Sequence, residues 1–377
     1  MKIMRRVLGG GAAGALVLAV SACGSAASTS SESASPPGDA GSAAASSAAA
    51  SPAPAGSAEA ASDGLICEGQ TVTLVSPQKA GDQSVVDDMI NNGLNAAETE
   101  LGATIKYVEA LDPSTYESTL ANAANAGSGI IATTFLEMGK PLQAAAAQFP
   151  DTKFIQIYGD PVEPAVDNLR TVSYRYDEAT YLSGLVAGAA TETNKLGYEG
   201  GMFIPGINSN FNAFKGAASS VNPDVEVVPG EVGSFSDDAK AKEVVSALYA
   251  QGVDIVQGDG PVIGLIEAAK DKGKYAIIGA PGLVDKAPAN VMGVTYIYFG
   301  KSLFDQIAAA CAADFAGGHV ASGVADGVTG FYVPDQFIAE GDPAMVQRVQ
   351  DALPAVAEAE AAIKSGDLVV PVDNAGP

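Results

Sequence analysis

Residues that commonly support catalysis are scarce in this sequence, which has one histidine, three cysteines and no tryptophan among 377 residues. The single histidine, His319, lies in Gly317-Gly318-His319-Val320, a pattern typical of a surface turn. A histidine-based triad and a multi-histidine metal site are therefore not expected. We also find no convincing Walker-type loop and no dinucleotide-binding Gly-x-Gly-x-x-Gly. The sequence predicts a protein that is not an enzyme and holds no metal or cofactor.

Basic residues are also few, with 20 Lys and Arg against 44 Asp and Glu and a net charge of −24. Nucleic acid and anionic membrane surfaces attract positive charge, so neither is expected as a binding partner. No cluster of Arg or Lys is suited to a highly anionic ligand. The acidity itself is adequately explained by a solvated, soluble surface.

The N-terminus has the layout of a signal peptide. Three basic residues among the first six precede an uncharged run over residues 7–22 that is rich in Ala, Val, Leu and Gly. The run ends Leu-Ala-Val-Ser-Ala before Cys23, which resembles the lipobox of bacterial lipoproteins. An ordinary secretory peptide with an incidental cysteine is the alternative. We predict a signal peptide over residues 1–22 and lipid, including palmitate, on Cys23, which would hold the protein to the outer face of the cell membrane.

A low-complexity segment follows the predicted lipidation site. From residue 24 to about residue 63 the chain is almost entirely Ser, Ala, Gly and Pro, and it has no Phe, Tyr, Leu or Ile from which to build a core. We predict that residues 23–66 form the lipidated cysteine and a disordered tether. A random coil of this length would reach about 35 Å.

Two cysteines remain if Cys23 is lipidated, namely Cys67 and Cys311. Outside the cytoplasm such a pair can form a disulfide. Two separate buried thiols are the alternative, because spacing along the chain does not reveal the Cα separation that a disulfide requires.

Short β-rich runs alternate with longer helical patterns after residue 69. The first series has predicted strands at 71–76, 103–108, 129–134 and 153–158, and a second series runs from a helix at 177–193 to a strand at 275–279. Repeated strand and helix predict parallel strands with right-handed crossovers. Two series of similar size predict two α/β lobes. Ligands of such sheets bind outside the carboxyl ends of the strands.

Several segments resemble the basic membrane protein family of substrate-binding lipoproteins, which includes purine nucleoside receptors. The resemblance covers most of residues 70–320 and is carried by Tyr181–Thr191, Lys195–Pro205, Val221–Asp224, Gly233–Lys240, Leu248–Asp254 and Glu267–Lys274. It implies a type I periplasmic-binding-protein fold, in which two doubly wound α/β lobes joined by a three-stranded hinge enclose a ligand cleft. It also implies a monomer that delivers a small solute to the permease of an ABC importer. We place lobe 1 at 67–172 plus about 287–330 and lobe 2 at 173–286 plus about 331–377.

The chain departs from the family at positions that contact nucleosides. The family's Asp-x-Ser-Phe-Asn reads Asp82-Gln83-Ser84-Val85-Val86 here, which keeps the acid and the serine but loses the aromatic and the amide. The family's Gly-Val-Asp, whose acid is expected to bind ribose hydroxyls, reads Gly279-Ala280-Pro281. A further family acid falls on Tyr158, and a family lysine falls near Tyr298. Hydroxyls buried without partners cost affinity, so a nucleoside is less expected than the family suggests.

The expected ligand is therefore a neutral or cationic solute that is nucleoside-, sugar- or aromatic-like. Aromatic side chains would stack on it, and carboxylates and amides would bind its hydroxyl or amino groups. Phe211 and Phe214 are three residues apart and would alternatively face the core from one helix. A sensory or adhesive lipoprotein without an importer is the alternative function, and an extracellular hydrolase has the least support. The candidate ligand-binding residues are Asp82, Ser84, Phe135, Tyr158, Asp160, Asn208, Phe211, Phe214, Asp259, Tyr296 and Tyr298.

Overall fold

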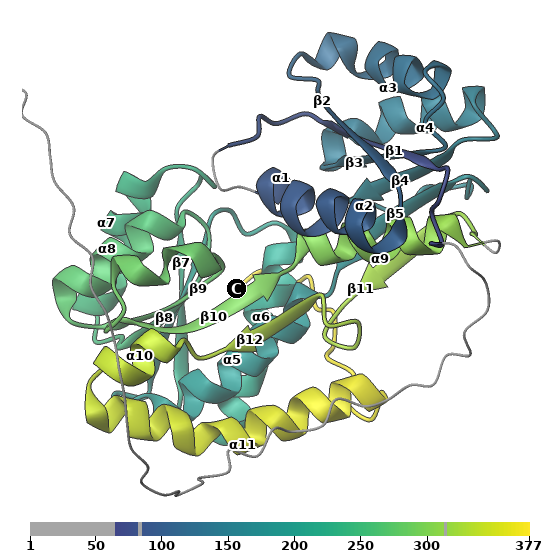
Figure 1. Cartoon of the computed structure of the whole chain (residues 1–377). Coiled ribbons are helices and arrows are strands. Elements are labelled where there is room, and N and C mark those ends of the chain that lie inside the picture. Colours follow the sequence, from purple (N-terminus) through teal and green to yellow (C-terminus); the bar gives the residue numbers. More distant parts are fainter. Residues whose placement is uncertain (1–64, 82–84, 313–314) are drawn as a thin grey trace, which may run out of the picture. The chain divides into compact units, whose positions relative to one another are not determined.

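The computed structural model describes residues 65–81, 85–312 and 315–377, which form two six-stranded sheets flanked by helices (Figure 1). The predicted signal peptide, Cys23 and nearly all of the predicted tether lie outside these residues, as do Asp82 and Ser84. In the part of the chain that is described, no helix combines the length and the apolar character that a membrane span requires.

The first sheet, sheet A, is entirely parallel and has the order β11-β5-β4-β3-β1-β2. Helices cover both of its faces, because alternate residues of each strand point to opposite sides. Leu74 and Ile155 pack with α2 and α9 on one face, whereas Val75 and Phe154 pack with α3 and α4 on the other. The strands are β1 (Thr71–Ser76), β2 (Thr104–Glu109), β3 (Ile130–Thr134), β4 (Lys153–Ile157), β5 (Leu169–Tyr174) and β11 (Gly318–Ser322). The helices are α1 (Val85–Asp88), the π-helical η1 (Met89–Leu94), α2 (Asn95–Leu101), η2 (Pro113–Thr115), α3 (Tyr116–Asn125), η3 (Leu136–Met138), α4 (Gly139–Gln148) and α9 (Phe299–Cys311).

The second sheet, sheet B, has the order β12-β10-β9-β8-β6-β7, in which only β12 is antiparallel to its neighbour. Ile255 and Ile277 face α5, α6 and α11, whereas Val256 and Ile278 face α7 and α8. The strands are β6 (Lys195–Gly200), β7 (Glu226–Glu231), β8 (Ile255–Asp259), β9 (Tyr275–Ile278), β10 (Val291–Ile297) and β12 (Thr329–Tyr332). The helices are α5 (Tyr176–Ala190), α6 (Pro205–Val221), α7 (Asp238–Ala250), α8 (Val262–Lys272), η4 (Pro281–Lys286), α10 (Asp335–Glu340) and α11 (Pro343–Ser365).

Helices α5 and α6 pack unusually closely, and two glycines of α5 permit it. A Cβ atom on Gly184 would lie 2.4 Å from the carbonyl oxygen of Phe214, and one on Gly188 would lie 2.6 Å from that of Ala218. Real Cβ atoms do not approach backbone oxygens this closely. The segment that carries the family resemblance at 181–191 is thus a packing interface on one face of sheet B.

The chain passes between the two sheets three times, after β5, after β10 and between β11 and β12. This arrangement confirms the predicted fold of two doubly wound α/β lobes with three connections. The predicted lobe boundary near residue 287 is wrong for β10, which we had placed in lobe 1. β10 pairs with β9 and β12 in sheet B, because the crossing to α9 comes only after Ile297.

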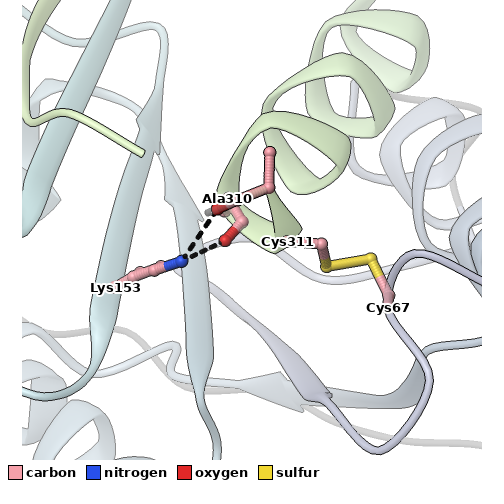
Figure 2. The surroundings of a disulfide bond; sticks show 5 residues. Cys67, Lys153, Ala310 and Cys311 are labelled. Carbon is pink, nitrogen blue, oxygen red and sulfur yellow. Dashed lines mark hydrogen bonds between the residues drawn. A yellow bond between two sulfur atoms is a disulfide. The ribbon is translucent and has the colours of Figure 1, made fainter. Parts of the chain in front are cut away.

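A disulfide joins the two cysteines that the structure describes. Cys67 precedes β1, Cys311 ends α9, and their Cα atoms are 5.2 Å apart (Figure 2). Beside the bond, the Lys153 amine donates hydrogen bonds to the carbonyl oxygens of Ala310 and Ala312. A positive charge at a helix C-terminus is favourable. The end of α9 is therefore attached both to the start of the fold and to β4.

Candidate functional site

Aromatic side chains gather at the carboxyl end of sheet A. Tyr158 follows β4, and its ring centroid lies 6.3 Å from Phe135 after β3, 6.0 Å from Tyr174 at the end of β5 and 6.2 Å from Phe299 at the start of α9. Tyr174 and Phe299 are 5.2 Å apart, edge to face. We call these four residues the aromatic cluster. β3, β4 and β5 are adjacent and parallel, so their ends meet at one edge of the sheet.

Two members of the aromatic cluster have unusual backbone conformations. Phe135 and Tyr158 have φ angles of 67° and 59°, in the left-handed region that bulky residues rarely adopt. The Phe135 N–H donates to the carbonyl of Ile157, 3.1 Å away, and the Gln156 side chain donates to the carbonyl of Phe135, 2.8 Å away. Such strained positions concentrate at functional sites. The Tyr158 side chain is 43% exposed, so it is accessible to a solute.

A carboxylate lies at the corresponding edge of sheet B. Asp259 ends β8, and its Oδ2 accepts hydrogen bonds from the Tyr198 hydroxyl at 2.8 Å and the Asn210 amide at 2.7 Å. Burial raises the pKa of Asp259 to about 6, although both hydrogen bonds oppose the shift. The group is therefore mainly ionised at neutral pH. Burial and then the charge of Asp259 raise the pKa of Tyr158 and of Tyr176.

A second acid is buried beside Asp259. Glu199 is opposite Gly258 in the pairing of β6 with β8, and its side chain is inaccessible to solvent. Within the described residues, neither of its carboxyl oxygens has a hydrogen-bond partner. Burial and then the charge of Asp259 raise the pKa of Glu199 to about 8, while the nearby backbone N–H of Asp259 opposes the shift. Glu199 is thus mainly protonated at pH 7.

Polar side chains support the region between β8 and α5. The Tyr176 hydroxyl at the start of α5 is 2.6 Å from the Thr295 hydroxyl of β10. Gln257 of β8 accepts a hydrogen bond from Ser183 at 2.8 Å and donates one to Thr295 at 3.3 Å. These bonds satisfy polar groups in an otherwise apolar interior. They also fix the position of β8 directly before Asp259.

The strand end at which the family acid is expected holds no carboxylate here. Gly279 and Ala280 follow β9, and Pro281 begins η4. A Cβ atom on Gly279 would lie 3.0 Å from the Tyr176 hydroxyl. On the neighbouring strand β8, Gln257 pairs with Ile277, and Asp259 ends that strand two residues later. The acid at this edge of sheet B is therefore on β8.

The remaining predicted residues are distributed over several places. Asp160 is exposed two residues after Tyr158, where it lines a cavity of about 130 Å³ with Gln143 and Gln156. Asn208 is buried in α6 and donates to the carbonyl of Asn374 at 3.0 Å, while its Oδ1 lacks a partner among the described residues. The rings of Tyr296 and Tyr298 stack with centroids 4.1 Å apart.

Phe211 and Phe214 are core residues, as the alternative interpretation of their spacing had it. Their exposed fractions are 1% and 0%, and their rings meet the buried ring of Tyr198 edge on at 5.4 and 5.7 Å. In this structure neither ring is accessible to a solute, so the prediction that they bind ligand is wrong here. Their helix still contributes to the site through Asn210.

Sequence reasoning missed five residues of the site, while Asn210 was considered as an alternative to Asn208 for binding an amide edge. The strand β5 was not predicted, because its polar residues weaken the pattern, so Tyr174 was not recognised as a residue at a strand end. Glu199 had a signal that went unused, namely an acid within a strand that is otherwise apolar. The five are Tyr174, Tyr176, Tyr198, Glu199 and Phe299.

Comparison with known proteins shows the family to which the chain belongs. The family described as ABC transporter substrate-binding protein PnrA-like matches residues 70–361. A purine-binding protein of Brucella abortus is 30% identical over 190 residues, which are 50% of this chain and 53% of that protein, so the match spans about half of its length. Basic membrane protein A of Borreliella afzelii is 29% identical over 243 residues, 62% of this chain and 72% of that protein. The crystal structure of an ABC transporter solute-binding protein from Aeropyrum pernix K1 has the same fold, with a TM-score of 0.63 and 21% identity over 81% of this chain and 94% of that one.

Proposed function

Because the chain belongs to the PnrA-like family of ABC transporter substrate-binding proteins, we propose that it is a lipid-anchored receptor that captures a small solute outside the cell membrane and delivers it to an ABC permease. The family is one of solute-binding proteins, not of enzymes. The observation that carries the proposal is the gathering of Tyr158 and its ring neighbours at the carboxyl ends of the strands of sheet A, together with Asp259 at the carboxyl end of β8 in sheet B. Solutes of α/β sheets bind at these ends.

The attachment to the membrane rests on Cys23 and the sequence before it. A diacylated or triacylated cysteine would give stable attachment, whereas one chain gives only marginal binding. Metabolic labelling with an alkyne analogue of palmitate should label the protein, and Cys23→Ala should remove the label. Release of the Cys23→Ala protein from the membrane fraction would support the anchor. A label that persists in this variant would contradict it.

The proposed solute has a ring or apolar face for the aromatic cluster and a hydroxyl or amino group for Asp259. Asp82 and Ser84, which lie outside the described residues, and Asp160 are further proposed contacts. The name of the Brucella relative includes purine binding, but Pro281 stands where the family's ribose-binding acid is expected. We therefore expect inosine and guanosine to bind at least about tenfold more weakly than they bind a family member with that acid, which corresponds to about 1.4 kcal/mol. Calorimetry that gives submicromolar binding of either nucleoside would contradict this expectation.

A thermal-shift screen of the purified protein tests the receptor function. The panel should contain nucleosides, hexoses and pentoses, and amines. A ligand present at about 100 times its Kd adds about 2.7 kcal/mol to the free energy of unfolding, which is measurable as a higher Tm. Deleting the gene should then reduce cellular uptake of the compound that stabilises the protein. The absence of any shift across the panel, or unchanged uptake, would contradict the proposed function.

A further inference from the structure

The acid at the end of β8 has no positive partner. Nine ion pairs occur in the part of the chain that the structure describes, and none includes Asp259 or Glu199. The side chains that donate hydrogen bonds to Asp259 are neutral, namely the Tyr198 hydroxyl and the Asn210 amide. Burying most of an ionised carboxylate costs free energy unless a positive charge nearby compensates for the lost hydration.

The geometry points to a subsite for a positively charged nitrogen formed by Asp259 together with the aromatic cluster, which makes the solute an amine or quaternary ammonium compound with an apolar body. This inference rests on the proposed function and narrows its solute class. It assigns to Asp259 and Tyr158 the preference for a positively charged solute over a neutral one.

The hydrogen bonds of Asp259 leave one oxygen for a ligand. Tyr198 and Asn210 both donate to Oδ2, and the described residues provide no hydrogen bond to Oδ1. Asp259 is partly exposed at the strand end. The two donors fix the orientation of the carboxylate before a ligand arrives, so little side-chain entropy is lost on binding.

The aromatic cluster supplies a surface that suits the same charge. The faces of tyrosine and phenylalanine rings attract cations. Tyr158 is the exposed member, and Phe135, Tyr174 and Phe299 lie around it with centroids about 6 Å away. Its hydroxyl remains neutral, because burial, Asp259 and Asp160 raise its pKa. A cation bound by both Asp259 and Tyr158 would meet a mainly ionised carboxylate and a ring face, and no Lys or Arg among the described residues forms an ion pair with Asp259.

Glu199 also favours a positively charged ligand over a neutral one. It is buried next to Asp259, and a second ionised carboxylate there would be unfavourable. A bound cation would stabilise Asp259 in its ionised form. A neutral hydroxyl compound would leave this charge uncompensated, which is why we favour the amine.

Matched pairs of compounds distinguish a cationic ligand from a neutral hydroxyl compound. We would titrate the purified wild-type protein by calorimetry with tyramine and its neutral counterpart tyrosol, and with choline and its neutral counterpart 3,3-dimethylbutan-1-ol. At least one cation should bind at least tenfold more tightly than its neutral counterpart. Asp259→Asn should remove this preference, and Tyr158→Leu should weaken the cation at least fivefold, whereas Tyr158→Phe should retain it.

Asp151→Asn is the matched control, because Asp151 is an exposed acid just before the amino end of β4 and the substitution changes the charge equally. It should leave the preference intact. Equal binding of both members of each pair, or a preference that survives Asp259→Asn in a folded protein, would overturn the inference. Binding of inosine or galactose without binding of either cation would overturn it and leave the receptor function standing. No binding of any of these compounds would count against both.

Discussion

At the scale of single residues, the site depends on acids placed in poorly hydrated surroundings. Glu199 is the clearest case, because its carboxyl group is buried without a partner among the described residues and its pKa rises from the ordinary 4.5 to about 8. Burial raises the pKa of Asp259 to about 6, although Tyr198 and Asn210 donate hydrogen bonds to one of its carboxylate oxygens. The two groups therefore titrate in different pH ranges, and near pH 7 Asp259 is mainly ionised while Glu199 is mainly protonated.

Glu199 makes the stability of the protein depend on pH. Folding raises its pKa, so the folded state holds the proton more tightly, and the resulting stability is complete below about pH 4.5 and is lost as the pH rises toward 8. The limiting slope is about 1.4 kcal/mol per pH unit. Glu199→Gln should remove most of this decline. Urea unfolding at pH 6.5 and pH 8, a range above the pKa of Asp259, should show a loss in the wild type and a smaller loss in the variant. Parallel curves for the two proteins would contradict the assignment.

Tyr158 should contribute directly to solute binding. Tyr158→Ala removes the exposed ring around which the aromatic cluster is arranged, and we expect at least a tenfold rise in Kd for whichever compound the screen identifies. Stability should be measured in parallel, and an unchanged Kd in a folded Tyr158→Ala protein would exclude this role.

The position of a single residue in the candidate site was predictable from the sequence where the end of its strand was predictable. Tyr158 and Asp259 follow apolar runs, so the sequence placed both at the carboxyl ends of strands, where ligands of α/β sheets bind. Phe211 and Phe214 were ambiguous, because a spacing of three residues places side chains on one helix face without revealing what that face contacts. Contacts between separate elements decide such cases, and one sequence does not contain them.

At the scale of elements, the contact between α5 and α6 is the least tolerant of change. Gly184→Ala would bring a Cβ atom to 2.4 Å from the carbonyl oxygen of Phe214, and the backbones would have to separate. We expect a loss of about 1–3 kcal/mol in the free energy of unfolding, measured by urea denaturation. Gly216→Ala is the matched control, because Gly216 is in α6 and a Cβ atom there meets nothing within 4 Å. It should be neutral or stabilise by up to about 1 kcal/mol. Similar losses in both variants would refute the packing explanation.

The order of most elements followed from the sequence, but one assignment to a sheet did not. Strand β10 is largely apolar, and nothing in its composition shows whether it adds to sheet A or sheet B. Its neighbours decide this, because β9 lies on one side and β12 on the other. The crossing to α9 after Ile297 then returns the chain to sheet A.

At the scale of the whole molecule, one covalent bond connects distant parts of the sequence. The disulfide between Cys67 and Cys311 closes a loop of 244 residues that includes all of sheet B except β12. Cross-links restrict the unfolded chain, and removing one from a domain commonly costs about 2–5 kcal/mol. The sequence left the pairing open, because only the folded chain brings the two residues together.

Removing the disulfide should lower the stability of the protein without removing the fold. Cys67→Ala with Cys311→Ala should have a lower Tm than the oxidised wild type, by an amount that corresponds to about 2–5 kcal/mol. Dithiothreitol should lower the Tm of the wild type toward that of the double variant and leave the variant unchanged. Equal Tm values for oxidised wild type and double variant would show that the bond contributes little.

The position of Cys67 also decides how mechanical force enters the fold. Any pull transmitted along the N-terminal segment reaches Cys67 before it reaches β1, because Cys67 comes four residues before Thr71. From there the force is transmitted through the disulfide to α9, whose C-terminal end is also hydrogen-bonded to Lys153 of β4. Strand β1, which lies between β3 and β2, is thereby shielded from being peeled out of its sheet.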